Sequence, residues 1–297
     1  MQVGIAQASV AADQRQALGI LGDDRVQDLG HTLGTVTRDR GVQGGFGVAH
    51  DFAPRLLSGA TGGRRIYSAT DSRVGQEVLL RPAATVVLLR DSDAGLEVLL
   101  IQRGRKLVFF GGAWAFPGGR VDDEDRAGAE DELAAARVAA VRETREEAGL
   151  EIAAEDLVPF SHWTTPPGPP RRFSTWFFLA HARSGGHVQV DGSETLAHRW
   201  IEIGAAIEAR ARGEIEIPPP TFATLVKIGT FPDARSALEA GRSRDVIYYL
   251  PRIHPVEGGV VSFYPGDVAY EDGDPEQPGP RRRMYRVESG WRYEDDV

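Results

Sequence analysis

Three glutamates with helical spacing are the residues of this sequence best suited to chemistry. Glu143 lies one helical turn before Glu146 and Glu147, so an α-helix would place the three carboxylates on one face. Like charges at this spacing destabilise an isolated helix, whereas a Mg²⁺ ion takes hard oxygen ligands and bridges carboxylates to phosphates. The spacing therefore indicates either a divalent metal site or an ordinary solvated helix face, and charge alone leaves both readings open.

A glycine pair upstream of the glutamates favours the metal site. Gly118 and Gly119 follow a Phe-Pro pair, and without side chains their backbone can approach a ligand closely and offer a carbonyl to a metal. We expect the two glycines to form a turn that binds substrate. We expect the glutamates to lie on a helix over 130–148 that ends at Gly149.

The glycine pair and the glutamates together resemble the signature of the Nudix hydrolase superfamily, G-x5-E-x7-R-E-U-x-E-E-x-G-U with U aliphatic. Gly119 matches its first glycine, and 142–150 matches its end. Asp125 replaces a glutamate of the signature, and Thr144 replaces an aliphatic residue. The segment between Asp125 and the signature arginine holds 16 residues instead of 7, which implies a nine-residue insertion around 127–136, either as extra helix or as a loop.

The resemblance implies a fold and a mechanism. Nudix hydrolases have an α+β fold, an α/β/α sandwich with a mixed curved sheet between helices, and hydrolyse X-linked nucleoside diphosphates with Mg²⁺ or Mn²⁺. Arg142 would orient a catalytic glutamate through a salt bridge, and either Glu146 or the downstream Glu194 would serve as general base. Four groups are the implied metal ligands: Glu143, Glu146, Glu147 and the carbonyl of Gly119.

Within the superfamily the chain resembles the peroxisomal-type coenzyme A diphosphatases, the nucleoside-diphosphate-linked moiety X motif nineteen-like branch, whose members carry an insertion inside the signature. The likeness rests on 81–86, 163–178, Glu194 with Trp200, and 264–267. It implies conversion of coenzyme A or acyl-coenzyme A to 4'-phosphopantetheine and adenosine 3',5'-bisphosphate. The alternatives are an ADP-ribose, dinucleotide or nucleotide-sugar diphosphatase, and a non-catalytic nucleotide-sensing Nudix module.

Two arginines and two tryptophans are further candidates for substrate contacts. Arg171 and Arg172 precede an aromatic strand, and planar guanidinium groups suit bidentate phosphate recognition. Two exposed arginines without a binding role are the alternative. Trp163 and Trp176 lie in predicted strands, where they either stack on adenine or, as large aromatic residues of strands more often do, pack in the core.

Composition excludes several classes of protein. There is no cysteine, which excludes disulfides, thiolate nucleophiles and cysteine-ligated metals. The net charge is -9, and 122–156 alone holds 13 acidic and 4 basic residues, so we expect no nucleic-acid partner but a small nucleoside diphosphate bound through metal. Without an apolar run near the roughly 20 residues of a membrane span or a secretory signal, we expect a cytoplasmic protein. The sequence does not decide whether the chain forms a homodimer.

The remaining pattern divides the chain into three parts. Residues 1–78 are glycine-rich without sustained periodicity and are expected to form a poorly ordered arm without catalytic residues. Residues 79–217 are expected to form the Nudix core, and 218–297 an α/β extension packed on it. The core should begin with a hairpin over 83–90 and 96–103. Further strands are predicted over 157–163, 175–182 and 198–203, and further helices over 205–212, 218–228 and 233–241.

Overall fold

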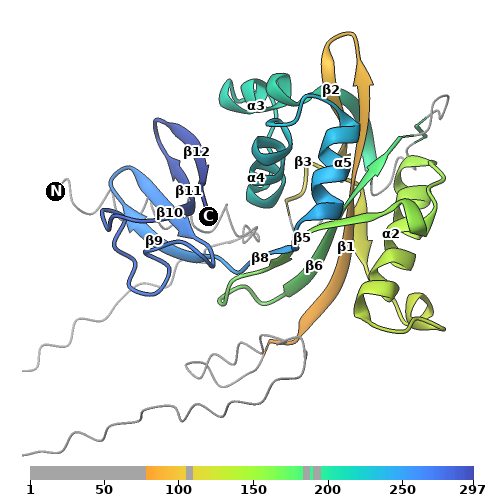
Figure 1. Ribbon diagram of the computed structural model, residues 1–297, viewed down its shortest axis with the longest axis horizontal. Coiled ribbons are helices and arrows are strands. Elements are labelled where there is room, and N and C mark those ends of the chain that lie inside the picture. The colour runs from red at the N-terminus through yellow and green to blue at the C-terminus, as the bar shows by residue number, and fades with distance from the viewer. Residues whose placement is uncertain (1–77, 105–109, 183–187, 190–194) are drawn as a thin grey trace, which may run out of the picture. The chain divides into compact units, whose positions relative to one another are not determined.

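Figure 1 shows the computed structural model of the chain, in which residues 78–104, 110–182, 188–189 and 195–297 are described. The predicted N-terminal arm, apart from its last residue, lies outside these ranges. No helix within them is long and apolar enough to cross a membrane. Their elements are two β-sheets, the helices α2 to α5 and two short 3-10 helices, η1 and η2.

The larger sheet is mixed, as predicted. Its strands follow the order β3-β2-β1-β6-β5-β8, with β4 paired to β1 and β7 paired to β2. The pairs β1–β6 and β5–β8 are parallel, and the other pairs are antiparallel. The predicted hairpin is the pair β1–β2. The strands are β1 (Leu80–Ser92), β2 (Gly95–Arg103), β3 (Trp114–Ala115), β4 (Gly118–Arg120), β5 (Val158–Thr164), β6 (Arg172–His181), β7 (Thr195–Glu202) and β8 (Ile247–Tyr249).

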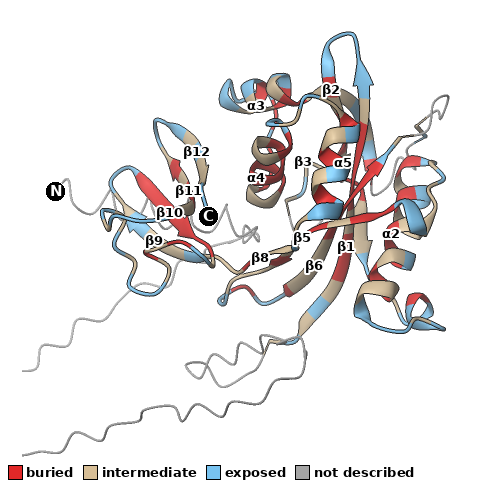
Figure 2. Cartoon of the chain, viewed as in Figure 1, coloured by how far each residue is buried: buried red, intermediate tan, exposed pale blue. Residues whose placement is uncertain are grey.

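Strand β1 separates two hydrophobic cores. Its residues Ala84, Val86 and Leu88 pack with α2 (Glu132–Ala148), and Val87 and Leu89 lie in a second core on the opposite face. This alternation follows from the two-residue period of a strand. The second core contains residues of the other three helices, α3 (Ile203–Ala211), α4 (Pro219–Ile228) and α5 (Ala234–Ser243). Helices therefore cover both faces of the sheet, and Figure 2 shows the buried residues along its strands and on α4.

Helix α2 forms where the sequence predicts it. Asp131 caps its N-terminus, because its carboxylate accepts a hydrogen bond from the Ala134 N–H at 2.8 Å. Gly149 ends it in the left-handed conformation, with φ of 65°. The insertion is thus part loop, over 127–131, and part helix. Small side chains let the helix lie close to the sheet; the buried ones are Ala135, Ala136, Ala139, Ala140 and Ala148.

The second sheet lies in the C-terminal extension and has the antiparallel order β12-β11-β10-β9. A fully buried ion pair supports it, since Asp267 accepts hydrogen bonds from Arg283 at 2.8 and 2.7 Å. Asp267 belongs to the stretch 264–267 that carries part of the family likeness, so this aspartate has a structural role. The strands are β9 (Arg252–Val256), β10 (Gly259–Phe263), β11 (Arg282–Val287) and β12 (Gly290–Asp295).

Aromatic and charged contacts join the second sheet to α4. The rings of Phe222 and Trp291 meet edge to face with centroids 5.5 Å apart. Asp295 accepts hydrogen bonds from Lys227 and from Arg282, and the second of these is 2.9 Å long. Helix α4 itself lies within the predicted extension, and its buried residues share a core with Val87 and Leu89 of β1. The predicted division of the chain, with boundaries at 78/79 and 217/218, stays a prediction.

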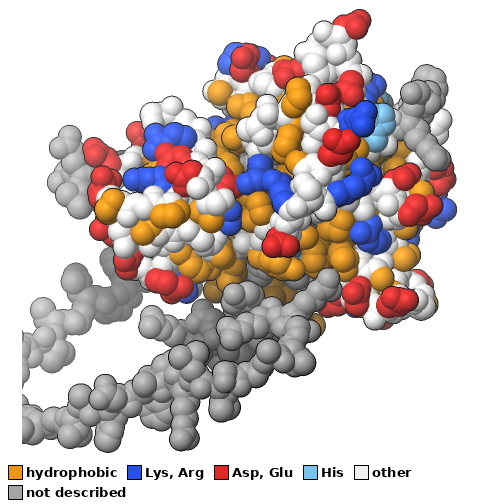
Figure 3. Space-filling model, viewed as in Figure 1, with side chains coloured by type: hydrophobic (Ala, Val, Ile, Leu, Met, Phe, Trp, Pro, Cys, Tyr) orange, Lys and Arg blue, Asp and Glu red, His pale blue; other side chains and the backbone are white. Residues whose placement is uncertain are grey.

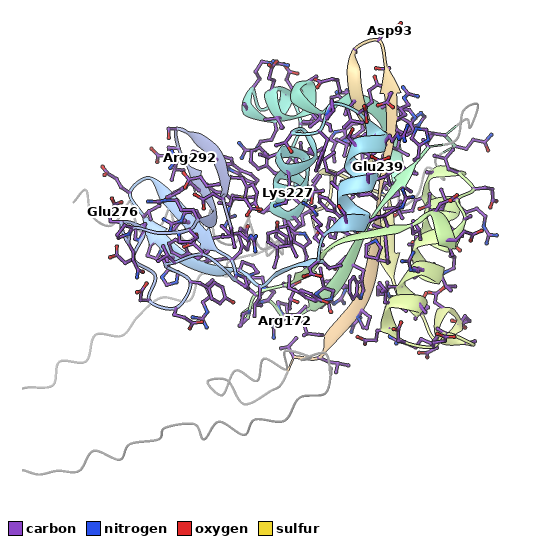
Figure 4. The ribbon with its side chains drawn as sticks, viewed as in Figure 1. Asp93, Arg172, Lys227, Glu239, Glu276 and Arg292 are labelled. Carbon is purple, nitrogen blue, oxygen red and sulfur yellow. The ribbon has the colours of Figure 1, made fainter. Side chains whose placement is uncertain are left out.

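The Asp295 carboxylate is only 6% exposed and neutralises two cations that are themselves largely buried. Replacing Asp295 with asparagine leaves Lys227 and Arg282 without a counter-charge, and we expect the free energy of unfolding to fall by about 3 kcal/mol. Urea denaturation at neutral pH measures this. Glu276→Gln, on an exposed loop (Figure 4), should change stability by less than about 0.5 kcal/mol. Equal stability of the two variants would contradict the assignment.

Candidate active site

The glycine pair forms a strand, and the expectation of a turn was wrong. Gly118 and Gly119 lie in β4, which pairs with β1 so that Gly119 is opposite Ala84. A Cβ atom on Gly118 would lie 2.2 Å from the Ala84 carbonyl oxygen, and one on Gly119 would lie 2.2 Å from Oε1 of Glu143. Both separations are far below van der Waals contact. At Gly118 the contact is with backbone, so only glycine fits there, whereas a side chain at Gly119 would displace the Glu143 carboxylate.

Two glutamates of α2 converge on this glycine pair. The carboxylate of Glu143 lies directly against Gly119, and Oε2 of Glu147 accepts a hydrogen bond from the Gly118 N–H at 2.8 Å. The one-turn spacing of the two glutamates on the helix places both on the side that meets β4. Glu146 lies further out, and its side chain is 51% exposed.

Arg142 connects the helix to the segments before it. Its Nε and Nη2 donate to the two oxygens of Asp125 at 3.0 and 2.8 Å, and Nη2 also donates to the Arg120 carbonyl at 3.0 Å. Its Nη1 donates to Glu143 at 2.9 Å and to Glu146 at 3.0 Å. Arg142 thus forms the predicted salt bridge to a glutamate of the signature, and in all it pairs with two glutamates and two aspartates, the second being Asp122 at 3.7 Å.

Asp125, in η1 (Glu124–Arg126), is a site residue whose role we did not predict from the sequence. It is buried and also accepts a hydrogen bond from the Asp122 N–H at 2.9 Å. The signal was its position in the signature, where the family carries a carboxylate that can reach the arginine. The short aspartate suffices because Arg142 extends across the space between α2 and η1.

The charges of the site perturb one another. Burial opposes ionisation of Asp125, but hydrogen bonds from Arg142 and from the Asp122 N–H outweigh it, so the pKa of Asp125 lies below its ordinary value. Burial raises the pKa of Glu143, and the pair with Arg142 offsets this only in part. The hydrogen bond to Asp125 raises the pKa of Arg142. The site thus holds the positive charge of Arg142 beside the Glu143 carboxylate, and a further positive charge would stabilise the ionised form of Glu143.

The donor groups suit a divalent metal, although no three of them form a complete cage. Among the described residues, no group of three or more histidine, aspartate or glutamate side chains is placed to hold a metal ion. Magnesium usually takes one or two carboxylates and completes its shell with water and substrate phosphates. Glu143 and Glu147, which lie on α2 against the glycine pair of β4, fit that requirement. The predicted set of four ligands stays a prediction.

The predicted arginines lie apart from the glutamates. Arg171 is exposed, whereas Arg172 is buried and donates from Nε to the Thr165 carbonyl at 3.0 Å. Arg172 pairs with Leu80 at the start of β1, four residues before the Ala84 level of the glycine pair, which corresponds to about 13 Å along a strand. Figure 4 shows Arg172 at that end of the sheet. The structure does not bring these arginines together with the carboxylates.

The two tryptophans have different environments. Trp163 is buried and stacks on Tyr249 with ring centroids 3.9 Å apart. Of its two predicted roles, it therefore has the one in the core. Trp176 is partly exposed and lies on the face of the sheet that carries α2. The remaining candidate, Glu194, is outside the described residues.

Comparison with known proteins agrees with this geometry. Residues 79–221 match the NUDIX domain family. The chain therefore contains a NUDIX domain. A solved NUDIX hydrolase from Alicyclobacillus acidocaldarius is 27% identical to it, with a TM-score of 0.50, and the match covers 55% of this chain and 97% of that one. The chain therefore has the α+β Nudix fold that the sequence predicts.

Two relatives extend the comparison. A Caenorhabditis elegans protein assigned as nudix hydrolase 7 is 27% identical over 239 residues, which cover 69% of this chain and 79% of that protein. The human acyl-coenzyme A diphosphatase NUDT19 is 33% identical over 121 residues, which cover 39% of this chain and 32% of the human protein. The match thus spans about a third of that diphosphatase. The relatives are named as hydrolases, and this NUDIX-domain protein is an enzyme.

The bidentate pair between Arg142 and Asp125 should stabilise the site measurably. Asp125→Asn keeps the shape of the side chain but removes the charge that faces Arg142, and we expect the free energy of unfolding to fall by about 2 kcal/mol. The partly exposed Arg142 and its other partners keep the loss below that of a wholly buried pair. Urea denaturation measures it, and Asp123→Asn, an exposed neighbour in the same turn, is the matched control. A loss no larger than the control's would show that the pair contributes nothing.

Proposed function

We propose that this NUDIX enzyme hydrolyses the diphosphate linkage of a nucleoside diphosphate derivative with Mg²⁺ or Mn²⁺. The observation that carries the proposal is the convergence of Glu143 and Glu147 on the backbone of Gly118 and Gly119. A carboxylate pair beside bare backbone has the oxygen donors that a hard cation needs. The family match supports the same chemistry.

Glu143 and Glu147 would hold the metal with the carbonyl of Gly119, and Glu146 would assist. Bound there, Mg²⁺ or Mn²⁺ neutralises the diphosphate and lowers the pKa of an attacking water. Burial raises the pKa of Glu143, and a positive charge beside a buried carboxylate stabilises its ionised form.

The chain's own residues would supply positioning and proton transfer. Arg142 holds Glu143 and Glu146 through Nη1 and so fixes the directions of both carboxylates. Glu146 is the more exposed of the two and is the one we propose as general base, with Glu194 as the other candidate. Positioning and charge stabilisation would account for most of the acceleration, as is general for phosphoryl chemistry.

Coenzyme A or an acyl-coenzyme A is the substrate we propose. The support is the likeness to proteins named acyl-coenzyme A diphosphatases, at 33% identity for the human one and 28% for the Xenopus laevis one. The products would be 4'-phosphopantetheine and adenosine 3',5'-bisphosphate. The cytoplasmic location and the homodimer stay predictions.

A substrate panel tests the proposed reaction. The purified full chain with Mg²⁺ is incubated with coenzyme A, an acyl-coenzyme A, ADP-ribose and NADH, and the products are separated by chromatography. Turnover of the coenzyme A compounds supports the proposal, and preferential turnover of ADP-ribose or NADH replaces the substrate but retains the chemistry. Binding without any turnover would identify a nucleotide-sensing module instead.

Glu147→Gln tests the metal-binding role. The amide oxygen of glutamine can still accept the hydrogen bond from the Gly118 N–H, so the fold should persist, while the charge that binds the cation is lost. We expect kcat to fall at least about a hundredfold. Glu132→Gln, an exposed residue in the first turn of the same helix, should leave kcat unchanged. Parental activity of Glu147→Gln would overturn the proposed site.

A further inference from the structure

Strand β4 forms an edge of the larger sheet beside the carboxylates, and an exposed arginine lies on it. Arg120 is the last residue of β4 and follows Gly119 directly, so their Cα atoms are about 3.8 Å apart. Among the described strands, β4 pairs only with β1. A ligand bound at the glycine pair would therefore lie next to Arg120, with no buried part of the sheet between them.

The backbone of Arg120 is fixed, whereas its guanidinium group is held only loosely. Its carbonyl accepts a hydrogen bond from Nη2 of Arg142 at 3.0 Å. Its own Nη2 lies 3.6 Å from Oδ1 of Asp122, in an ion pair whose two side chains are 58% and 44% exposed. Exposed ion pairs contribute little stability. A phosphate can therefore replace Asp122 as the partner of Arg120 at little cost.

This ion pair places the guanidinium group of Arg120 at the rim of the carboxylate site. Oδ2 of the same Asp122 lies 3.7 Å from Nη2 of Arg142, and Arg142 donates from Nη1 to Glu143 at 2.9 Å. A continuous series of ion pairs thus connects Arg120 to a glutamate that meets the glycine pair. Figure 3 shows Asp and Glu side chains gathered over the segment that leads into α2, so Arg120 is a weakly paired cation in acidic surroundings.

A second exposed arginine lies on the same face of the sheet as Arg120. Arg120 pairs with Ala83 of β1, and paired residues point to the same face. Arg81 is two residues before Ala83 and is exposed, so it is a diagonal neighbour of Arg120, about 7 to 8 Å away. Like charges at this spacing repel each other, and an anion between them would remove the repulsion.

We propose that Arg120, with Arg81 beside it, binds the diphosphate of the substrate at the edge of β4. The proposal rests on the function proposed above and names the residues that recognise the charge of the substrate. The two carboxylates proposed as metal ligands offset both charges of a Mg²⁺ ion, so the negative charge of the diphosphate needs a further cation. The planar guanidinium group forms bidentate hydrogen bonds with phosphate oxygens.

Arg142 is the other cation of the site, but its donors are already in use. Its Nε and Nη2 donate to Asp125, its Nη1 donates to two glutamates, and Nη2 also donates to the Arg120 carbonyl. Binding a phosphate through Arg142 would break contacts that orient the carboxylates. Arg120 has only its loose pair with Asp122 to exchange, and it is therefore the arginine that binds the substrate.

Binding of ADP to the full chain tests this assignment without any need for turnover. Isothermal titration calorimetry in the presence of Mg²⁺ compares the parent with Arg120→Ala, Arg120→Lys and Arg81→Ala. Loss of a bidentate pair should weaken ADP binding about tenfold in Arg120→Ala. The lysine variant keeps the charge but not the planar donors and should lose about threefold, as should Arg81→Ala. Thermal unfolding verifies that each variant is folded.

Arg126→Ala is the matched control, because Arg126 is an exposed arginine of η1, and its ADP affinity should stay within about twofold of the parent's. Inorganic diphosphate is the second probe, and Arg120→Ala should weaken its binding by the same factor as that of ADP. Weaker ADP binding with unchanged diphosphate binding would assign Arg120 to the nucleoside and contradict the proposal. Failure of the parent to bind either probe, or equal ADP affinity in Arg120→Ala and Arg126→Ala, overturns it as well.

Failure of this proposal and failure of the proposed reaction give different results. A parent that binds ADP through Arg120 but hydrolyses no member of the substrate panel would retain the diphosphate site and refute the reaction. Hydrolysis of the panel by Arg120→Ala with the KM of the parent would retain the reaction and refute the site.

Discussion

The bidentate contact between Arg142 and Asp125 is the interaction on which the geometry of this site depends. It joins residues on either side of the inserted segment, so the nine extra residues add length without displacing the end of α2. The guanidinium group has five donors in a fixed plane, and here they bind η1, the backbone of β4 and two glutamates of the helix at once. One side chain therefore sets the rotation of α2 and the directions of the carboxylates.

Close approach of backbone to backbone is the second requirement. The alanines of α2 bring the helix onto the sheet, and the two glycines of β4 let a strand lie between β1 and a carboxylate. Each of these residues contributes by lacking side-chain volume. The result is a site in which oxygen donors and backbone meet without intervening side chains, which is the arrangement that a small, strongly charged ligand requires.

Much of this could be predicted because the signals are local. The hairpin over 83–90 and 96–103 and the helix stop at Gly149 depend only on neighbouring residues. The strand at Gly118 could not, because a glycine pair reads as a turn and its pairing with β1 involves residues more than 30 positions earlier. Trp163 and Trp176 look alike in sequence, and the face that each occupies is decided by the pairing of β5 with β6. Burial of Arg172 likewise follows from its place at the start of β6, not from its type.

Helix α4 is shared by two parts of the molecule. The match to the family ends at residue 221, in the first turn of α4 (Pro219–Ile228), while Phe222 and Lys227 of the same helix contact Trp291 and Asp295 of the second sheet. A fragment excised at the family boundary would end inside a helix and expose the side chains that now meet the second sheet. The second sheet therefore cannot be exchanged between homologous proteins without α4. The smallest segment that could be transplanted extends beyond residue 221, where the family match ends.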